Sequence, residues 1–80
     1  MSKKQPTPHA AVARVLAKMA DSLEADQPDD EMTNAARIGQ ICQFIPGQPD
    51  LFDHVFPATP PVVPQCTRRE YAAELRAVTA

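Results

Sequence analysis

The stretch PHAAVARVLAKMADSLEA, residues 8–25, decides the fold of this chain. Its large apolar residues recur every three or four positions, as they do on one face of an α-helix. This stripe consists of Val12, Val15, Leu16, Met19 and Leu23. Thr7 and Pro8 match the N-cap and first-turn preferences of a helix start, and Pro28 limits how far the helix can run. We therefore expect a helix over residues 8–25 whose stripe faces a core.

A second helix is expected at about 30–45, because three acidic residues at its start complement the positive end of a helix dipole. Apolar or small residues then follow at spacings of three or four, namely Met32, Ala35, Ile38, Cys42 and Ile45. Gly39 in the middle of this segment suggests a close approach to the first helix. The connection at 26–29 is short, so the two helices should be antiparallel neighbours.

A third helix is expected at about 67–79. Thr67 and Glu70 have the spacing of a capping box, in which each side chain bonds the backbone amide of the other residue. The apolar face of this helix is narrow and consists of Tyr71, Leu75 and Val78. A helix this short is marginal in water, so it should dock on the first two helices or on another chain.

Six prolines interrupt residues 46–66, where they deny the backbone both helix continuity and donors for a sheet. We expect an extended connector there, with room for one helical turn at 50–55. The expected fold class is therefore all-α: three short helices, with a helix hairpin joined to the C-terminal helix by an extended proline-rich segment. Residues 1–7 are expected to be a flexible N-terminus, and residues 8–80 a single small domain.

The composition of the 80 residues argues against an enzyme. The chain holds three Phe, one Tyr and no Trp, which is little large apolar material for lining a catalytic pocket. Its net charge of −2 makes nucleic acid a disfavoured partner, because phosphate binding relies on clustered positive charge. No window approaches the roughly 20 apolar residues of a membrane helix. We expect a soluble, cytoplasmic protein with no cofactor and no membrane partner.

Cys42 and Cys66 are expected to be free thiols, since the chain shows no secretory signal. A zinc site would have to combine them with His9 and His54, yet no pair has the close spacing by which one turn supplies two ligands. A cysteine nucleophile beside His54 would need a third orienting group and a pocket. We therefore expect neither a metal site nor catalysis.

Residues 48–52, Gln-Pro-Asp-Leu-Phe, form the one short motif that stands out. Gln48 comes first, Asp50 third, and the pair Leu51 and Phe52 closes it. The motif resembles the pentapeptide with which bacterial replication and repair proteins dock on the sliding clamp of DNA polymerase, although a proline stands second, where leucine is frequent. The resemblance implies a sliding clamp as the partner and these four residues as the docking site.

The same segment also permits a structural interpretation, in which Leu51, Phe52, Val55 and Phe56 fold back as a lid over the helix hairpin and complete its core. The following residues, 57–64, are either a polyproline II ligand or a stiff connector.

The function that these patterns favour is that of a non-enzymatic protein–protein interaction module, or a small modulator or inhibitor of a larger partner. In size and composition the chain resembles small phage and plasmid accessory proteins. The alternative is a small dimeric DNA-binding regulator that places Lys3, Lys4 and Arg14 on phosphates. A homodimer would also complete the narrow apolar faces of the first and third helices.

Overall fold

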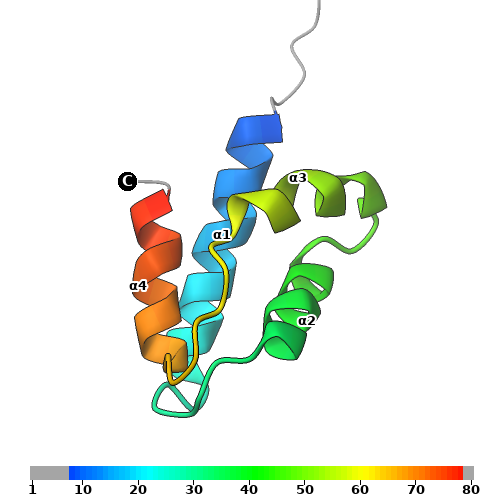
Figure 1. Cartoon of the computed structure of the whole chain (residues 1–80). Helices are drawn as coiled ribbons and strands as arrows, with labels where there is room; N and C mark the ends of the chain where they lie inside the picture. Colours follow the sequence, from blue (N-terminus) through cyan, green and yellow to red (C-terminus); the bar gives the residue numbers. More distant parts are fainter. Residues whose placement is uncertain (1–7, 79–80) are drawn as a thin grey trace, which may run out of the picture.

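The computed structural model describes residues 8–78, and their fold is all-α, as expected (Figure 1). It has four helices where three were predicted, and a short 3₁₀ turn. These elements are α1 (Pro8–Ala25), α2 (Asn34–Phe44), η1 (Pro49–Leu51), α3 (Phe52–Ala58) and α4 (Arg68–Val78). Within the described residues there is no strand beyond a single antiparallel bridge between Glu31 and Thr67. The predicted N-cap, Thr7, and the predicted flexible segment 1–7 lie outside the described residues.

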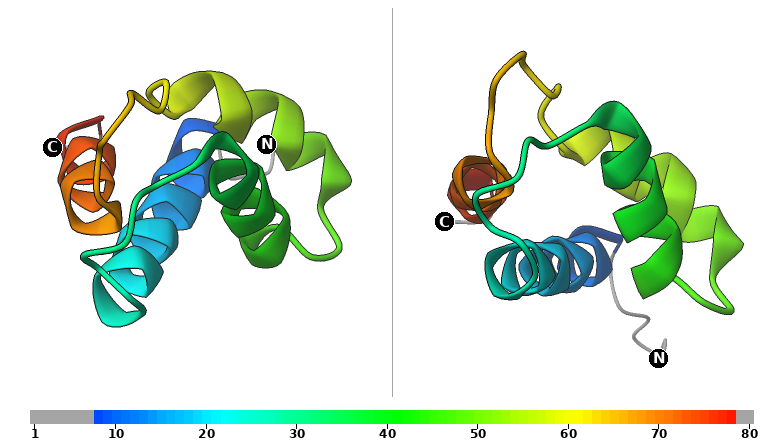
Figure 2. Two further views of the ribbon diagram at one scale, coloured as in Figure 1. Left: turned by 60° about the horizontal axis from the view of Figure 1, so that its bottom comes forward. Right: turned by 90° about the horizontal axis from the view of Figure 1, so that it is seen from below.

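The main helix pair is α1 with α4, whereas the sequence predicted a hairpin of the first two helices. Figures 1 and 2 show α4 running back along one side of α1, while α2 and α3 lie on its other side. The capping box that starts α4 is confirmed. The Glu70 amide donates to Thr67 Oγ1 at 3.1 Å, and the Thr67 amide donates to Glu70 Oε1 at 2.9 Å.

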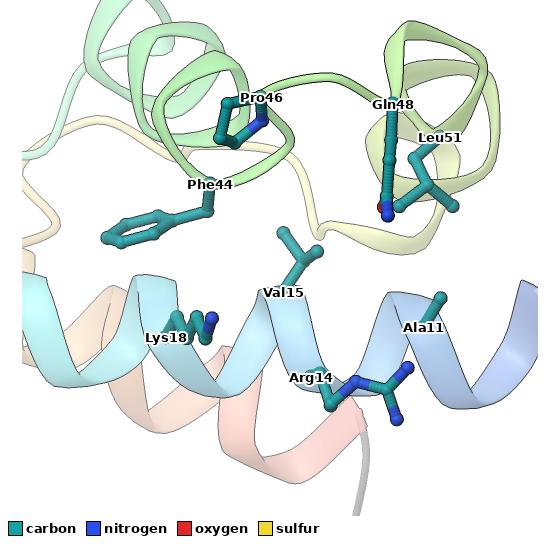
Figure 3. A pocket seen from close by; sticks show the side chains of 8 residues that line it. All are labelled: Ala11, Arg14, Val15, Lys18, Phe44, Pro46, Gln48 and Leu51. Carbon is teal, nitrogen blue, oxygen red and sulfur yellow. The ribbon is translucent and has the colours of Figure 1, made fainter.

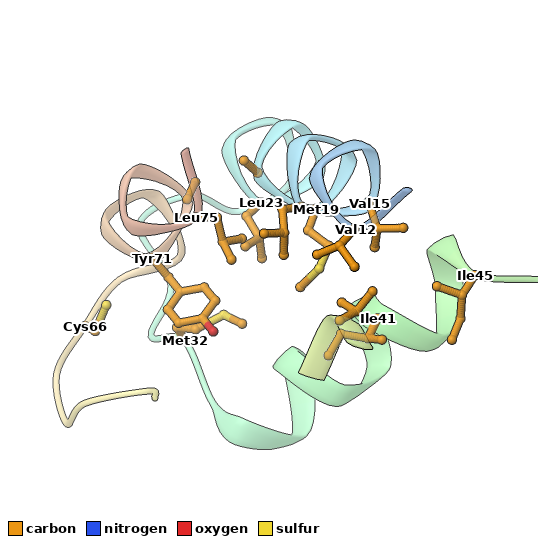
Figure 4. Close-up of a cluster of buried hydrophobic side chains, with 14 residues drawn as sticks. Val12, Val15, Met19, Leu23, Met32, Ile41, Ile45, Cys66, Tyr71 and Leu75 are labelled. Carbon is orange, nitrogen blue, oxygen red and sulfur yellow. The ribbon is translucent and has the colours of Figure 1, made fainter. Parts of the chain in front are cut away.

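The predicted stripe of α1 is buried along its whole length and forms the middle of the core (Figure 4). From α4 the core receives Tyr71 and Leu75, both fully buried, whereas Val78 at the end of the predicted face is 47% exposed. The Tyr71 hydroxyl donates to the Pro60 carbonyl at 2.6 Å. This bond ties the segment before α4 to the core, so the connector has one fixed path.

Helix α2 starts at Asn34, four residues later than predicted, because the residues before it bind other backbone. The Met32 amide donates to the Cys66 carbonyl at 2.7 Å, and the Arg68 amide donates to the Asp30 carbonyl at 2.8 Å. Thr33 is the actual N-cap, and its side chain accepts from the Ala36 amide. The acids at 29–31 therefore belong to a turn paired with the start of α4.

The buried face of α2 also differs from the prediction. Met32 and Ile45 of the predicted stripe are buried, whereas its other members, Ala35, Ile38 and Cys42, are exposed. Ile41, outside the predicted stripe, is buried, and Phe44 is partly buried. The observed and predicted sets both recur at spacings of three and four, so helical periodicity alone allows either face to point inward. The predicted close approach at the helix's glycine is wrong as well, because a Cβ there would meet no atom within 4 Å.

The proline-rich segment is not extended throughout, since η1 and α3 together make it helical over residues 49–58. Pro49 is tolerated because it stands at the first position of η1, where a missing amide donor is not needed. Pro57 lies inside α3, one residue before its end. Val55 is fully buried, and Leu51, Phe52, Ala58 and Phe56 pack against the core as partly buried side chains. This packing matches the fold-back alternative for the segment.

Among the described residues, no helix is long and apolar enough to cross a membrane.

Candidate functional site

A pocket of about 260 Å³ lies between the N-terminal half of α1 and the chain that links α2 to η1 (Figure 3). We call it the α1 pocket. Its lining comes from two segments far apart in sequence. The first is Ala11, Arg14, Val15 and Lys18 on α1, and the second is Phe44 at the end of α2, Pro46 and Gln48 in the link, and Leu51 at the end of η1.

A tight turn after α2 brings the second half of this lining against α1. Gly47 adopts a φ of 78°, a left-handed conformation that glycine adopts readily because it lacks a Cβ. The Gln48 amide then donates to the Ile45 carbonyl at 3.0 Å, and the Leu51 amide donates to the Gln48 carbonyl at 2.9 Å. In Figure 3 the side chains of Gln48 and Leu51 extend toward α1. The pocket therefore depends on the reversal of the chain at Gly47.

The structure places the four predicted docking residues in three environments. Gln48 and Leu51 line the α1 pocket. Asp50 is exposed. Phe52 packs against the core and stacks on Phe56, with ring centroids 5.5 Å apart and planes 9° apart. Only two of the four residues therefore share a surface that a partner can reach.

Arg37 of α2 holds the far end of α3 in place. Its guanidinium donates to Thr59 Oγ1 at 2.8 Å and to the carbonyl oxygens of Phe56 and Thr59 at 3.3 and 3.2 Å. It also lies 4.2 Å from the centroid of the Phe56 ring, a cation–π geometry. Positive charge is favourable at the carbonyl end of a helix. We call η1 and α3 together the lid. The contacts of Arg37 hold the lid against α2.

Within the described chain, the basic residues at the α1 pocket form no ion pairs, whereas the arginines of α4 do. At the opposite end of α1, arginines of α4 pair with acids: Arg76 with Asp21 at 2.8 Å and Glu24 at 2.6 Å, Arg69 with Asp29 at 2.7 Å, and Arg68 with Asp26 at 3.7 Å. Arg14 and Lys18 are exposed and make no ion pair with any residue of 8–78. The rim of the pocket is therefore positive, although the chain as a whole is negative.

Sequence reasoning missed most of this site. It correctly assigned Val15 to the core but not to a pocket, and it named neither Ala11, Lys18 nor Phe44 as a site residue. The one usable signal was the spacing of Arg14 and Lys18, four residues apart and therefore on the same side of a helix. That spacing does not show that the arginines of α4 form ion pairs with the acids at residues 21–29, which leaves those acids bound away from Arg14 and Lys18.

The α1 pocket is lined by apolar side chains, two cations and one amide. The lining contributes no carboxylate, imidazole, thiol or hydroxyl side chain. Burial raises the pKa of both Cys66 and Tyr71, but neither side chain lines the pocket. Within the described residues no three His, Cys, Asp or Glu side chains gather to hold a metal ion, and both cysteines are free, Cys42 exposed and Cys66 buried.

Comparisons with protein-family models, with curated proteins and with solved structures find no match to this chain.

Proposed function

We propose that this protein is a non-enzymatic interaction module of the cytoplasm, which binds a larger partner through the α1 pocket and thereby modulates it. The observation that supports this most directly is the composition of the pocket. Apolar side chains form part of its lining, and polar atoms form most of the accessible surface, to which Gln48 contributes an amide. Arg14 and Lys18 also line the pocket, without acidic partners among the described residues. Such a surface offers apolar burial, charge and a hydrogen-bonding group to a partner.

The proposal is tested by filling the pocket while the fold is kept. Ala11 lines the pocket, so Ala11→Trp should occupy it, whereas Ala17 is exposed on α1 away from the pocket and provides the matched variant Ala17→Trp. Affinity capture from a bacterial lysate with both variants and the native chain, followed by mass spectrometry, identifies the partner. We expect one protein to be retained by the native chain and by Ala17→Trp and lost with Ala11→Trp. Equal retention by both variants would remove the pocket from the interaction.

The bacterial sliding clamp is the candidate partner that the resemblance of residues 48–52 names. Docking of that motif would require Leu51 and Phe52 to leave the core surface that they now cover. The energy of clamp binding would therefore have to exceed the cost of exposing these side chains. Titration of the intact protein against purified clamp, with Gln48→Ala as the control, tests the identity. No binding at high micromolar clamp would eliminate this partner and leave the pocket proposal standing.

A small dimeric DNA-binding regulator is the second proposal, and the unpaired cations Arg14 and Lys18 favour it. A dimer would present two copies of this pair to one duplex, as dimeric DNA-binding proteins do with their recognition elements. Binding through phosphates weakens steeply with salt, because each contact releases counterions. A gel-shift series over salt, together with sedimentation analysis, tests this proposal. A monomer that shifts no duplex even at low salt would exclude it.

A further inference from the structure

The distribution of charge along α1 indicates what kind of segment the α1 pocket accepts. The acids that follow Arg14 and Lys18 on the same helix are Asp21 and Glu24, and both are bound to Arg76 of α4. Asp50, which adjoins the pocket residue Leu51, is exposed and makes no ion pair with either cation. The described chain therefore neutralises the acidic end of α1 internally and leaves the basic end for a ligand.

The size of the pocket indicates how much of a ligand enters it. Its volume of about 260 Å³ is below the roughly 300 to 1,000 Å³ typical of small-molecule sites. Val15, Phe44 and Leu51 give it an apolar part, whereas polar atoms make up most of its accessible lining. A single large apolar side chain with part of its backbone suits such a space, as anchor residues do at protein interfaces.

We infer that the α1 pocket binds an acidic segment of a partner protein, in which one large apolar side chain enters the pocket and flanking carboxylates pair with Arg14 and Lys18. This inference rests on the proposed function and specifies its partner. Arg14 and Lys18 are four residues apart, so their Cα atoms are separated by about 6 Å along the helix axis. Alternate residues of an extended chain lie about 6.6 Å apart on one face, so two acidic residues two positions apart match this spacing, and the apolar anchor then stands two positions before or after them on the same face.

Charge complementarity also argues against the chain's own N-terminal residues as the occupant. Residues 1–7 contain Lys3 and Lys4 and no acid, so their charges would repel Arg14 and Lys18. The partner segment must instead bring negative charge of its own.

Two-dimensional amide NMR of the intact protein with three synthetic peptides tests the inference. The first probe is a short peptide with one central leucine and glutamates at alternate positions on either side of it, and the other two carry serines or lysines in place of the glutamates. We expect the acidic peptide to bind about 2- to 25-fold more tightly than the serine peptide at low salt, since each of two exposed ion pairs contributes a factor of about 1.5 to 5. Shifts should concentrate on the amides of Ala11, Val15, Phe44 and Leu51.

Substitutions then assign the charge dependence. Arg14→Gln with Lys18→Gln should weaken binding of the acidic peptide by about 2- to 25-fold and leave the serine peptide unaffected. The fold should survive, because both side chains are exposed and unpaired among the described residues. Arg69→Gln is the matched control, since it removes one exposed arginine at the far end of α1 and should leave peptide binding unchanged.

Each other outcome overturns the inference in a recognisable way. Equal binding of all three peptides would show that the pocket takes an apolar anchor without charge selection, and the proposed function would stand. Shifts of the pocket amides by protein concentration alone would identify a second copy of the chain as the occupant. Shifts by a DNA duplex but by no peptide would assign the rim to nucleic acid. If no probe shifts the pocket amides, the acidic occupant is wrong, whereas the proposed function itself fails only if capture is insensitive to Ala11→Trp.

Discussion

The double substitution Leu51→Ala with Phe52→Ala should destabilise the protein, because both side chains pack against the core as partly buried residues. Full burial would make the loss about 2 to 5 kcal/mol for Leu→Ala and about 3 to 5 kcal/mol for Phe→Ala. Since both side chains keep part of their surface in water, we expect about 1 to 2 kcal/mol each and about 3 kcal/mol together. In a domain of this size that corresponds to a fall in Tm of about 10 to 25 °C.

Urea unfolding followed by circular dichroism measures this loss, and Val63→Ala is its control. Val63 is 50% exposed in the connector, so its truncation should change the free energy of unfolding by less than about 0.5 kcal/mol. The dependence on urea should keep the same slope, since a changed slope would indicate altered compactness instead of a lost contact.

An unchanged free energy of unfolding in the double variant would refute the reasoning. It would mean that η1 and the start of α3 do not cover the core in solution, and that Leu51 and Phe52 are free to act as the anchors that the sequence motif implies. The experiment therefore decides between a segment that belongs to the fold and one that is available for docking.

Three further predictions concern α4 and the cysteines. Thr67→Ala should lower stability by about 1 kcal/mol, and a double-mutant cycle with Glu70→Ala should show non-additive losses, because the two side chains cap each other's amides. Tyr71→Phe should cost about 1 kcal/mol at neutral pH in a urea melt, since a hydroxyl bond to the connector is lost. Burial raises the pKa of Tyr71 above its ordinary value of 10.0, so the native chain should be fully stabilised by this group below pH 10 and lose that stability as the pH rises through the raised value. Tyr71→Phe should lack this alkaline loss. Iodoacetamide should modify Cys42 rapidly and Cys66 only on unfolding, as mass spectrometry with and without urea would show, since Cys42 is exposed and the buried Cys66 thiol has a raised pKa. Equal modification rates for the two thiols in the folded protein would contradict the described packing of Cys66.

Local patterns in the sequence determined two of the helices. The stripe of α1 has one consistent apolar face, so its burial follows from the helical period alone. The start of α4 follows from the capping box, because Thr67 and Glu70 satisfy each other's amides within one turn. Both patterns rest on residues three or four apart, which any helix brings together.

The tertiary structure alone decided which face of α2 is buried and what residues 49–58 become. Two apolar sets on α2 share the same period, and contact with α1 and α3 selects Ile41 over Ile38 and Cys42. The proline-rich segment becomes helical because Val55 can be buried there and Arg37 binds the carbonyls at its end. Neither contact is visible to a pattern that spans a few residues.

The α1 pocket is likewise a product of the tertiary structure. Its lining joins residues 11–18 to residues 44–51, which meet only because the chain reverses at Gly47 and the lid packs onto α1. The positive charge at its rim also depends on the packing of α4 against the other half of α1. The arginines of α4 pair with the acids there, so those acids do not neutralise Arg14 and Lys18. The sequence determines how many charges the chain carries, but the fold determines which of them remain unpaired, because ion pairing depends on distances in space and not on separation along the chain.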